Sequence, residues 1–225
     1  MIKQRIYFYY VLVKGLLVMA FQLIYGVWKV SRLPAPIVTI FGGARLKQDD
    51  PIARHAHELS HRLARAEISV ISGGGPGIMQ AVNCGVRHEE KHVKARTLGI
   101  TVKGLSKTEP VNPCAQDFIV TDQFAVRKWL MINFSVAFIV FPGGFGTVDE
   151  FAEVITLMQT KKLPGVPVIL VGAQYWDLLI RWLKESALPK GLVSQKDLDL
   201  IYVTDDLEDI VCKVKEQCAL CTPCA

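Results

Sequence analysis

The segment from Pro142 to Glu150 places a glycine turn beside an acid, a combination that can do chemistry on a bound anion. An apolar run of strand type ends just before it at Phe141, and a helical pattern follows it. Glycines at a strand-to-helix turn let backbone N–H groups approach a ligand, and the positive end of the helix dipole favours phosphate. The turn residues expected to contact such a ligand are Gly143, Gly144, Gly146 and Thr147.

A second glycine turn, which begins at Ser72, also follows an apolar run and opens a helical pattern. It does not fit the G-x-G-x-x-G dinucleotide pattern, because Ile78 stands three residues after Gly75. We therefore expect no nicotinamide or flavin, and no other cofactor. The turn by itself could be purely structural, but its pairing with the first turn favours anion binding. Its expected ligand-binding residues are Gly73, Gly74, Gly75, Gly77 and Met79.

The two turns together resemble those of a known family, the LOG proteins. These are cytokinin riboside 5'-monophosphate phosphoribohydrolases that are often mislabelled as lysine decarboxylases. Their PGGxGTxxE motif is matched at every fixed position from Pro142 to Glu150, and their GGGPGIM turn begins here at Gly73. An Arg-Lys pair precedes the first motif in the family and is found here as Arg127-Lys128. The likeness extends over the body of the chain, from about residue 37 to about residue 211.

The resemblance implies roles for two side chains. Arg127 matches the catalytic arginine of the family, and Glu150 matches its catalytic glutamate. Adjacent residues on a helix point about 100° apart, so Lys128 is expected to attract the substrate phosphate or to form an ion pair instead. A solvent-exposed Arg-Lys pair without function is the ordinary alternative.

Glu150 has two competing interpretations in the sequence. Thr147 and Glu150 fit the T-x-x-E capping box, in which the glutamate only supports the start of a helix. Asp149 could also be the acid in place of Glu150. The family motif ends in glutamate, so the resemblance favours Glu150.

One departure from the family lies after the first predicted strand, where the usual Gly-Ser is replaced by Gly42-Gly43. The missing hydroxyl removes a possible nucleotide contact. Arg45 could replace it as a ligand of phosphate or ribose.

The resemblance implies hydrolysis of the N-glycosidic bond of a purine nucleoside 5'-monophosphate, possibly of cytokinin type, to free base and ribose 5-phosphate. It also implies a homodimer. The alternative is a non-catalytic protein that binds or carries a nucleotide or a pterin-type cofactor. A decarboxylase is disfavoured, because no lysine stands in a recognisable pyridoxal-phosphate context.

Two further clusters have metal-like spacing. His57 and His61 fit H-E-x-x-H, but both lie off the apolar seam of their helix, so a solvated face is expected rather than zinc. Cys218, Cys221 and Cys224 are spaced like metal or iron–sulfur ligands, yet a reduced, disordered tail is the favoured interpretation. The remaining cysteines are expected to be thiols in a reducing, cytoplasmic compartment: Cys84, Cys114 and Cys212.

The elements that must position these residues follow an α/β pattern. Short apolar runs alternate with helical patterns, which predicts a doubly wound, Rossmann-like parallel sheet with helices on both faces. Ligands bind such sheets at the carboxyl ends of the strands, where both glycine turns fall. We expect this catalytic domain over residues 34–217, preceded by a hydrophobic helix over 1–33 and followed by the Cys-rich tail, 218–225. The net charge of +5 is spread without a basic stripe, so nucleic acid is not an expected partner.

The hydrophobic segment from residue 6 to residue 30 is long enough to cross a bilayer, with basic residues at both ends. Lys14 near its middle would cost about 2.5–3.5 kcal/mol in a spanning helix. Lys14, Gln22 and Lys29 share one helical stripe, which suits a helix lying on the inner face of the membrane. Packing against the chain's own domain or a partner subunit is the alternative.

Overall fold

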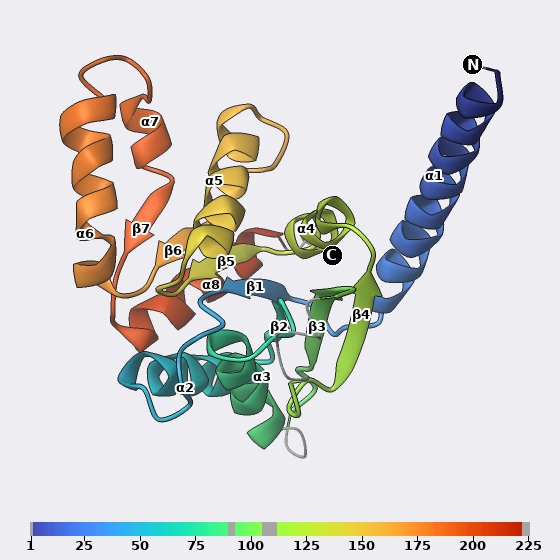
Figure 1. Cartoon of the computed structure of the whole chain (residues 1–225). Coiled ribbons are helices and arrows are strands. Elements are labelled where there is room, and N and C mark those ends of the chain that lie inside the picture. Colours follow the sequence, from blue (N-terminus) through green and yellow to red (C-terminus); the bar gives the residue numbers. More distant parts are fainter. Residues whose placement is uncertain (1, 90–92, 105–111, 222–225) are drawn as a thin grey trace.

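The computed structural model describes residues 2–89, 93–104 and 112–221, and within them seven strands form a single sheet (Figure 1). All neighbouring strands are parallel, which confirms the predicted doubly wound α/β class. The strand order is β4-β3-β2-β1-β5-β6-β7. The bounds are β1 Ile37–Phe41, β2 Ser69–Ser72, β3 Thr97–Val102, β4 Asp117–Thr121, β5 Ala137–Val140, β6 Val168–Leu170 and β7 Ile201–Val203.

Helices cover both faces of this sheet. On one face α2 (Pro51–Arg65), α3 (Ile78–His88) and α8 (Leu207–Cys221) enclose one apolar core with the sheet. On the other face α4 (Phe124–Ile132), α5 (Phe145–Gln159) and α6 (Ala173–Trp182) enclose a second core. A π-helical segment (Leu183–Ala187) continues α6, and the short α7 (Gln195–Leu198) leads into β7. The two layers of helices lie above and below the sheet in Figure 1.

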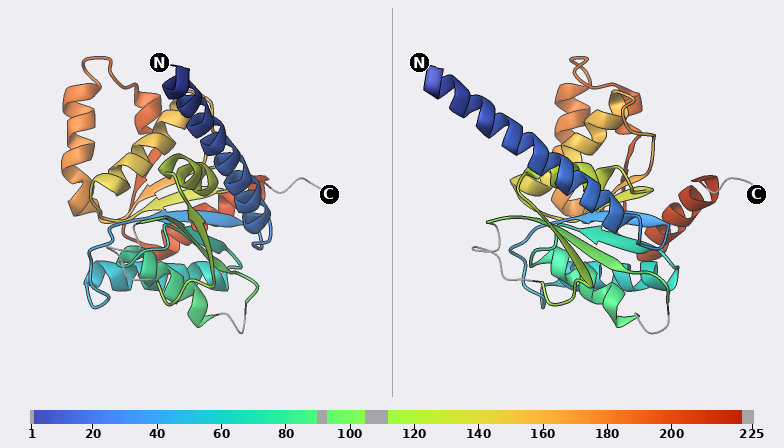
Figure 2. Two further views of the ribbon diagram at one scale, coloured as in Figure 1. Left: turned by 45° about the vertical axis from the view of Figure 1, so that its right-hand side comes forward. Right: turned by 90° about the vertical axis from the view of Figure 1, so that its right-hand side faces the viewer.

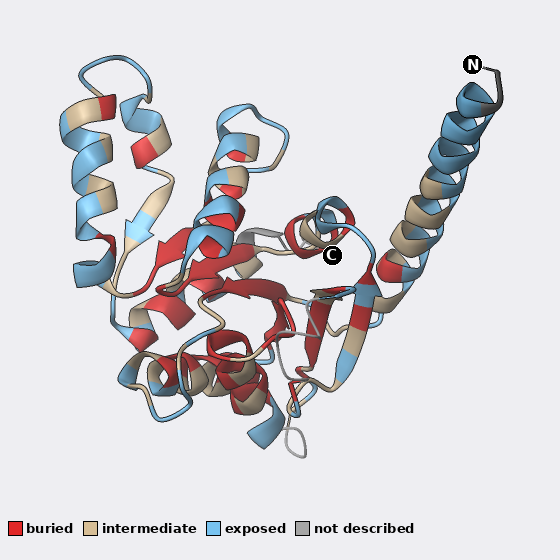
Figure 3. Cartoon of the chain, in the orientation of Figure 1, coloured by how far each residue is buried: buried red, intermediate tan, exposed pale blue. Residues whose placement is uncertain are grey.

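The central strands are buried on both faces, as their continuous apolar runs predict. Every residue of β1, β2, β5 and β6 is buried, whereas the edge strands β4 and β7 are partly exposed (Figure 3). The glycine turns extend from this rigid centre, so the backbone groups that they present are held firmly in place.

The chain reverses its direction of winding between β1 and β5. From β1 it proceeds outward through β2, β3 and β4, and it then returns to β5, which pairs with β1 from Val38 opposite Ala137 onward. Ligands of open α/β sheets bind at such a switch point, beside the carboxyl ends of the strands. Both glycine turns follow strands adjacent to β1 at this place.

A disulfide joins Cys84 on α3 to Cys114, which precedes β4. The expectation that both residues are thiols is therefore wrong. They stand 30 residues apart in the chain, and only the packing of α3 beside the approach to β4 brings them together. Cys212 is an exposed thiol. Cys224 and the side chain of Cys221 lie outside the described residues, so the expectation for the tail stays a prediction.

The N-terminal helix α1 (Ile2–Val30) is present as predicted and extends away from the body (Figure 2). It contacts α4 and β4, whereas residues 4–14 are all exposed. The segment from Gln4 to Val30 is long and apolar enough to cross a membrane. Packing along its whole length on its own domain is excluded by this geometry.

Candidate active site

Three turns at the carboxyl edge of the sheet are joined by backbone hydrogen bonds. They are the β1 turn (residues 42–44), the β2 turn (73–77) and the β5 turn (142–144). The Gly43 N–H donates to Pro142 O at 3.0 Å, and Gly43 O accepts from Ile78 N at 3.0 Å. The β1 turn therefore fixes the distance between the two glycine turns that the sequence identified.

A buried ion pair lies beside these turns. The Nη2 of Arg127 stands 3.0 Å from Oε1 of Glu150, and the two side chains are only 11% and 9% exposed. The Nε of Arg127 donates to Ile100 O in β3 at 2.9 Å, which fixes the guanidinium. Helix α4 supplies the arginine and α5 the glutamate, so the two residues that the family resemblance selected meet in space.

Burial raises the pKa of the Glu150 carboxyl above the usual glutamate range, and the positive charge of Arg127 acts against this shift. The neighbouring Asp149 raises the pKa further, while Lys128 lowers it. A raised carboxyl pKa of this origin is common among catalytic acids and bases.

Gly73 brings the β2 turn against this ion pair. A Cβ at Gly73 would lie 2.3 Å from Nη2 of Arg127 and 2.6 Å from Sδ of Met79. A side chain at this position would therefore displace the guanidinium. The β2 turn, Arg127 and Glu150 consequently form one site.

Two other turn glycines are required by the fold itself. Gly77 has a φ of +65°, and a Cβ there would lie 2.3 Å from Gly43 O. A Cβ at Gly143 would lie 2.1 Å from Oγ1 of Thr147 and 2.9 Å from Gly43 N. These contacts explain Gly77 and Gly143 without reference to a ligand.

Gly144 and Gly146 have no such explanation in the fold. A Cβ at either position would meet no atom within 4 Å, and neither residue has a positive φ. Gly146 lies in the first turn of α5, where glycine costs about 1 kcal/mol relative to alanine. Glycines that the backbone does not need leave open space before a helix N-terminus, which is how a phosphate-binding turn is built.

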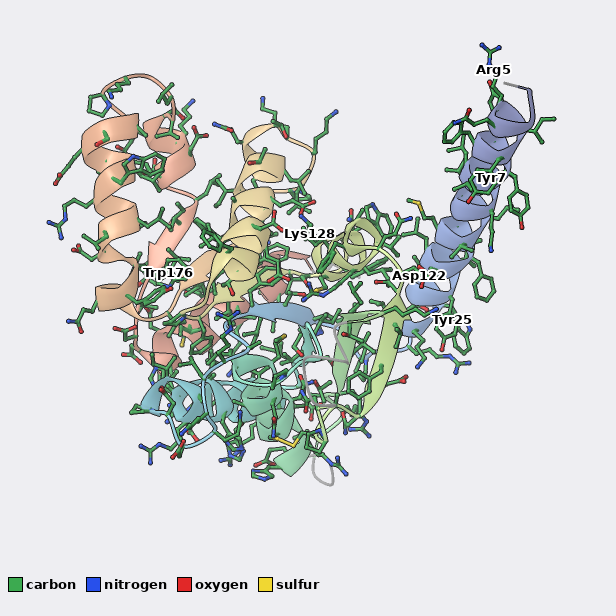
Figure 4. All side chains as sticks on the ribbon, viewed as in Figure 1. Arg5, Tyr7, Tyr25, Asp122, Lys128 and Trp176 are labelled. Carbon is green, nitrogen blue, oxygen red and sulfur yellow. A yellow bond between two sulfur atoms is a disulfide. The ribbon has the colours of Figure 1, made fainter. Side chains whose placement is uncertain are left out.

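Lys128 forms an ion pair, as one of its two predicted roles required. Its Nζ lies 3.0 Å from Asp149 and 2.6 Å from Glu153, both on α5, and Figure 4 shows Lys128 between α4 and α5. The side chain is 19% exposed, so it joins α4 to α5 beside the site. Asp149 is 62% exposed in this contact, whereas Glu150 is buried against Arg127. A direct contact of Lys128 with phosphate stays a prediction.

The capping-box interpretation of Thr147 and Glu150 is wrong. Helix α5 begins at Phe145 after Gly144, with no side-chain cap, so Thr147 already lies inside the helix. Glu150 lies one turn further along and pairs with Arg127. Its position is therefore not explained by support of the helix start.

Two contacts to the glycine turns were not expected from the sequence. The buried Asn112 donates from Nδ2 to Gly75 O and to Met79 O, both at 3.2 Å. The hydroxyl of Tyr175 donates to Gly143 O at 2.5 Å. No local pattern marks either residue, because each reaches its turn from a distant part of the chain.

The two histidines of the H-E-x-x-H pattern contact α3 and are half-buried, so the expectation of a solvated face is wrong. The ring of His57 packs edge-on against His88 with centroids 4.8 Å apart, and His61 Nε2 lies 3.2 Å from Glu89. No group of three or more His, Cys, Asp or Glu side chains that could hold a metal occurs among the described residues. Arg45 is exposed in the chain that follows the β1 turn, and its proposed contact with a ligand stays a prediction.

The fold and the site together define a doubly wound α/β protein with glycine turns at the carboxyl edge of its sheet and a buried arginine–glutamate pair beside them. The chain belongs to the family described as possible lysine decarboxylase, whose pattern matches residues 79–214. This confirms the resemblance stated from the motifs.

Curated relatives are named for activity on nucleoside monophosphates. A pyrimidine/purine nucleotide 5'-monophosphate nucleosidase of Escherichia coli K12 is 27% identical over 152 residues, which are 64% of this chain. The match covers only 33% of the length of that enzyme. A probable cytokinin riboside 5'-monophosphate phosphoribohydrolase of Oryza sativa subsp. japonica is 30% identical over 72% of this chain and 64% of the relative. A cytokinin riboside 5'-monophosphate phosphoribohydrolase of Arabidopsis thaliana is 28% identical over 80% of this chain and 81% of the relative.

Solved structures share the fold at lower identity. A molybdenum cofactor carrier protein from Chlamydomonas reinhardtii superposes with a TM-score of 0.59 at 20% identity, over 82% of this chain and 98% of that one. A molybdenum cofactor binding protein from Rippkaea orientalis superposes with a TM-score of 0.58 at 20% identity, over 80% and 96% of the chains. At this identity the likeness shows the fold alone.

Proposed function

We propose that this protein hydrolyses the N-glycosidic bond of purine nucleoside 5'-monophosphates, giving the free base and ribose 5-phosphate. The observation that carries the proposal is the buried Arg127–Glu150 pair beside glycines that the fold does not require. The printed names of the curated relatives support the same reaction class.

The glycine turns bind the phosphorylated sugar in this proposal. The N-terminus of α5 faces the open space at Gly144 and Gly146, where its N–H groups and dipole hold the 5'-phosphate. The β2 turn lies against Arg127 and holds the ribose. In this proposal C1' of the sugar lies beside the carboxylate of Glu150.

The reaction requires charge stabilisation and proton transfer. The C1'–N bond breaks, its electron pair leaves with the base, and positive charge develops on the ribose. The Glu150 carboxylate stabilises that charge and accepts a proton from the attacking water, whose oxygen bonds to C1'. Arg127 donates a hydrogen bond to the departing base, which takes up a proton from solvent, and Glu150 then returns its proton to solvent. General acid–base catalysis of this type supplies about 10²–10⁴-fold in rate.

Burial strengthens the electrostatic effect of Glu150 on the reacting sugar. Charges interact more strongly in a low-dielectric site than in water, so a buried carboxylate stabilises a nearby cationic centre effectively. The raised pKa of Glu150 lets the same group hold and release a proton. These steps use side chains of the chain alone.

The test is to incubate the full chain with a panel of nucleoside 5'-monophosphates and the matching nucleosides, and to measure free base and ribose 5-phosphate. We expect base release from AMP and little or none from adenosine, because the phosphate supplies much of the binding energy. Equal turnover of both would refute phosphate binding at the glycine turns. Tight AMP binding without any base release would favour the non-catalytic carrier.

We also infer a homodimer in the cytoplasm. Exposed apolar side chains on α4 and α5 support a subunit interface near the site: Phe124, Trp129, Phe145 and Val148. Light scattering of the full chain checks the dimer, and a monomer at micromolar concentration would overturn it. In this proposal the body lies at the inner face of the membrane, held there through residues 6–30.

A further inference from the structure

The N-terminal part of α1 exposes apolar side chains on every side. All residues from 4 to 14 are exposed, and only 6% of the most apolar stretch of the helix is buried in the protein. Figure 3 shows this part of the helix as an exposed column beyond the body. The large apolar side chains exposed here are Ile6, Tyr7, Phe8, Tyr9, Tyr10, Val11, Leu12, Val13, Leu16 and Leu17.

The other end of α1 is fixed to the body by polar contacts. The Nε2 of Gln22 donates to Asp122 at 2.7 Å, and Asp122 N donates back to Gln22 Oε1 at 3.0 Å. Lys29 forms an ion pair with Asp117 and donates to Phe118 O at 2.9 Å. Figure 4 shows Asp122 at the base of the helix, with Arg5 at its far end.

These contacts change the interpretation of the helical stripe formed by Lys14, Gln22 and Lys29. A helix that lies flat on a membrane needs a polar face toward water. Gln22 and Lys29 turn toward the chain's own body, so they do not supply that face. From Ile6 to Val13 the sequence is apolar or aromatic through more than two helical turns, and Lys14 is the one polar side chain between Val13 and Gln22. A helix that is apolar on all sides belongs inside an apolar medium.

The free length of α1 matches the hydrocarbon core of a bilayer. From Arg5 to Gln22 the helix rises about 26 Å at 1.5 Å per residue, against a core thickness of about 30 Å.

Aromatic and basic residues stand at both ends of this length. Tyr7 lies near the far end and Tyr25 near the body (Figure 4). Arg32 stacks on the Trp28 ring at 3.9 Å, just beyond the fixed end. Such residues favour the two interfaces of a membrane.

We propose that α1 inserts lengthwise into a lipid bilayer and holds the body at the membrane surface through its fixed end. Gln22 and Lys29 make the junction rigid, so the body keeps a defined orientation to the membrane. The proposal concerns residues outside the candidate site and stands whether or not the chain is a nucleosidase.

The test is flotation of the full chain with vesicles of phosphatidylcholine and phosphatidylglycerol, followed by a wash in 1 M salt. We expect the protein to float with the vesicles and to stay bound after the wash, because apolar insertion is not screened by salt. Protein that remains at the bottom of the gradient would overturn the proposal. Self-association through α1 without vesicle binding would identify a second copy as its partner and would also overturn it.

Two substitutions on opposite sides of the helix separate insertion from flat binding. Tyr10 and Leu12 point about 200° apart on an α-helix. Lengthwise insertion predicts that Tyr10→Lys and Leu12→Lys each reduce flotation at least several-fold, whereas a helix lying flat would be sensitive to only one of them. Leu178→Lys is the matched control, because Leu178 is 72% exposed on α6 away from α1. It should float as the unmodified protein does, and equal loss in the control would contradict the assignment to α1.

Discussion

The candidate site and α1 depart from ordinary protein architecture in opposite directions. The site buries a guanidinium and a carboxylate, whereas α1 exposes a long apolar surface to water. Charged side chains are almost never fully buried unless paired, and large exposed apolar surfaces on soluble proteins mark interaction sites. The two proposals assign each departure to a binding role, of the site for a substrate and of α1 for a membrane.

The two regions also differ in how firmly the rest of the protein holds their side chains. Arg127 is fixed by Ile100 O, by Glu150 and by the close approach of Gly73, so the site is preorganised before any ligand arrives. The free part of α1 has no such contacts, and its surroundings must come from outside the described chain. A preorganised polar site fits catalysis, and an unsupported apolar helix fits anchoring.

The largest effect is expected when the buried pair is broken. Arg127→Leu leaves Glu150 buried without its partner, which costs about 3–5 kcal/mol in unfolding free energy. The double variant Arg127→Leu/Glu150→Leu should recover most of this loss, since no charge remains to be buried. Urea denaturation measures both. If the double variant is no more stable than the single one, the lost stability does not come from an uncompensated carboxylate.

This loss should depend on pH in a defined direction. Burial raises the pKa of Glu150, and without Arg127 the pKa rises further. A carboxyl with a raised folded pKa contributes stability below its unfolded pKa and loses that contribution as pH rises through the folded value. The destabilisation by Arg127→Leu should therefore grow as pH rises above the range where a free glutamate titrates. A constant difference between the variants across pH would contradict a buried carboxylate.

A somewhat smaller effect is expected at the charge nearest the middle of the free part of α1. Lys14 costs about 2.5–3.5 kcal/mol at the centre of an inserted helix, whereas each Leu, Ile, Phe or Val contributes only about 0.3–0.6 kcal/mol. Lys14→Leu should therefore strengthen vesicle binding markedly, as measured by flotation against lipid concentration. A helix lying flat with Lys14 in the headgroup layer would bind anionic vesicles less well after the same change.

Asn112 should affect substrate binding more than chemistry. Asn112→Asp removes the donors to Gly75 O and Met79 O while the carboxylate still accepts from Cys114 N. Leaving these buried carbonyl oxygens unpaired costs about 1–3 kcal/mol, and the buried carboxylate that faces them adds to this cost. We expect KM for AMP to rise with little change in kcat, because the β2 turn holds the ribose and not the reacting bond. A fall in kcat at unchanged KM would assign Asn112 a different role.

The smallest effect is expected for Gly146→Ala, which tests whether this glycine serves ligand binding or the fold. Gly146→Ala should raise unfolding free energy by about 1 kcal/mol, because its Cβ meets open space within a helix. The same change should weaken AMP binding, since the methyl group occupies the space proposed for phosphate. Gly15→Ala in α1 is the control, because it also meets no neighbour and lies far from the site. Unchanged AMP affinity in Gly146→Ala would contradict a phosphate bound at this turn.

Local patterns predicted the sheet and both glycine turns. Arg127 and Glu150 came from family motifs, since no periodicity indicates that residues 23 positions apart meet across two helices. The Cys84–Cys114 disulfide, the Asn112 contacts and the packing of His57 on His88 were missed because each depends on tertiary placement. The capping box was wrong because the helix began two residues before Thr147, and helix ends are set by turn geometry as well as by residue type.

The most direct test of catalysis by Glu150 compares ribose 5-phosphate release from AMP by the unmodified chain and by Glu150→Gln. AMP binding is measured by calorimetry on the same samples. Glutamine keeps the shape of the side chain but cannot carry the negative charge or accept the proton from water. We expect AMP binding to persist while the rate of base release falls at least about 10²-fold. A Glu150→Gln variant that releases base at the unmodified rate would contradict this expectation.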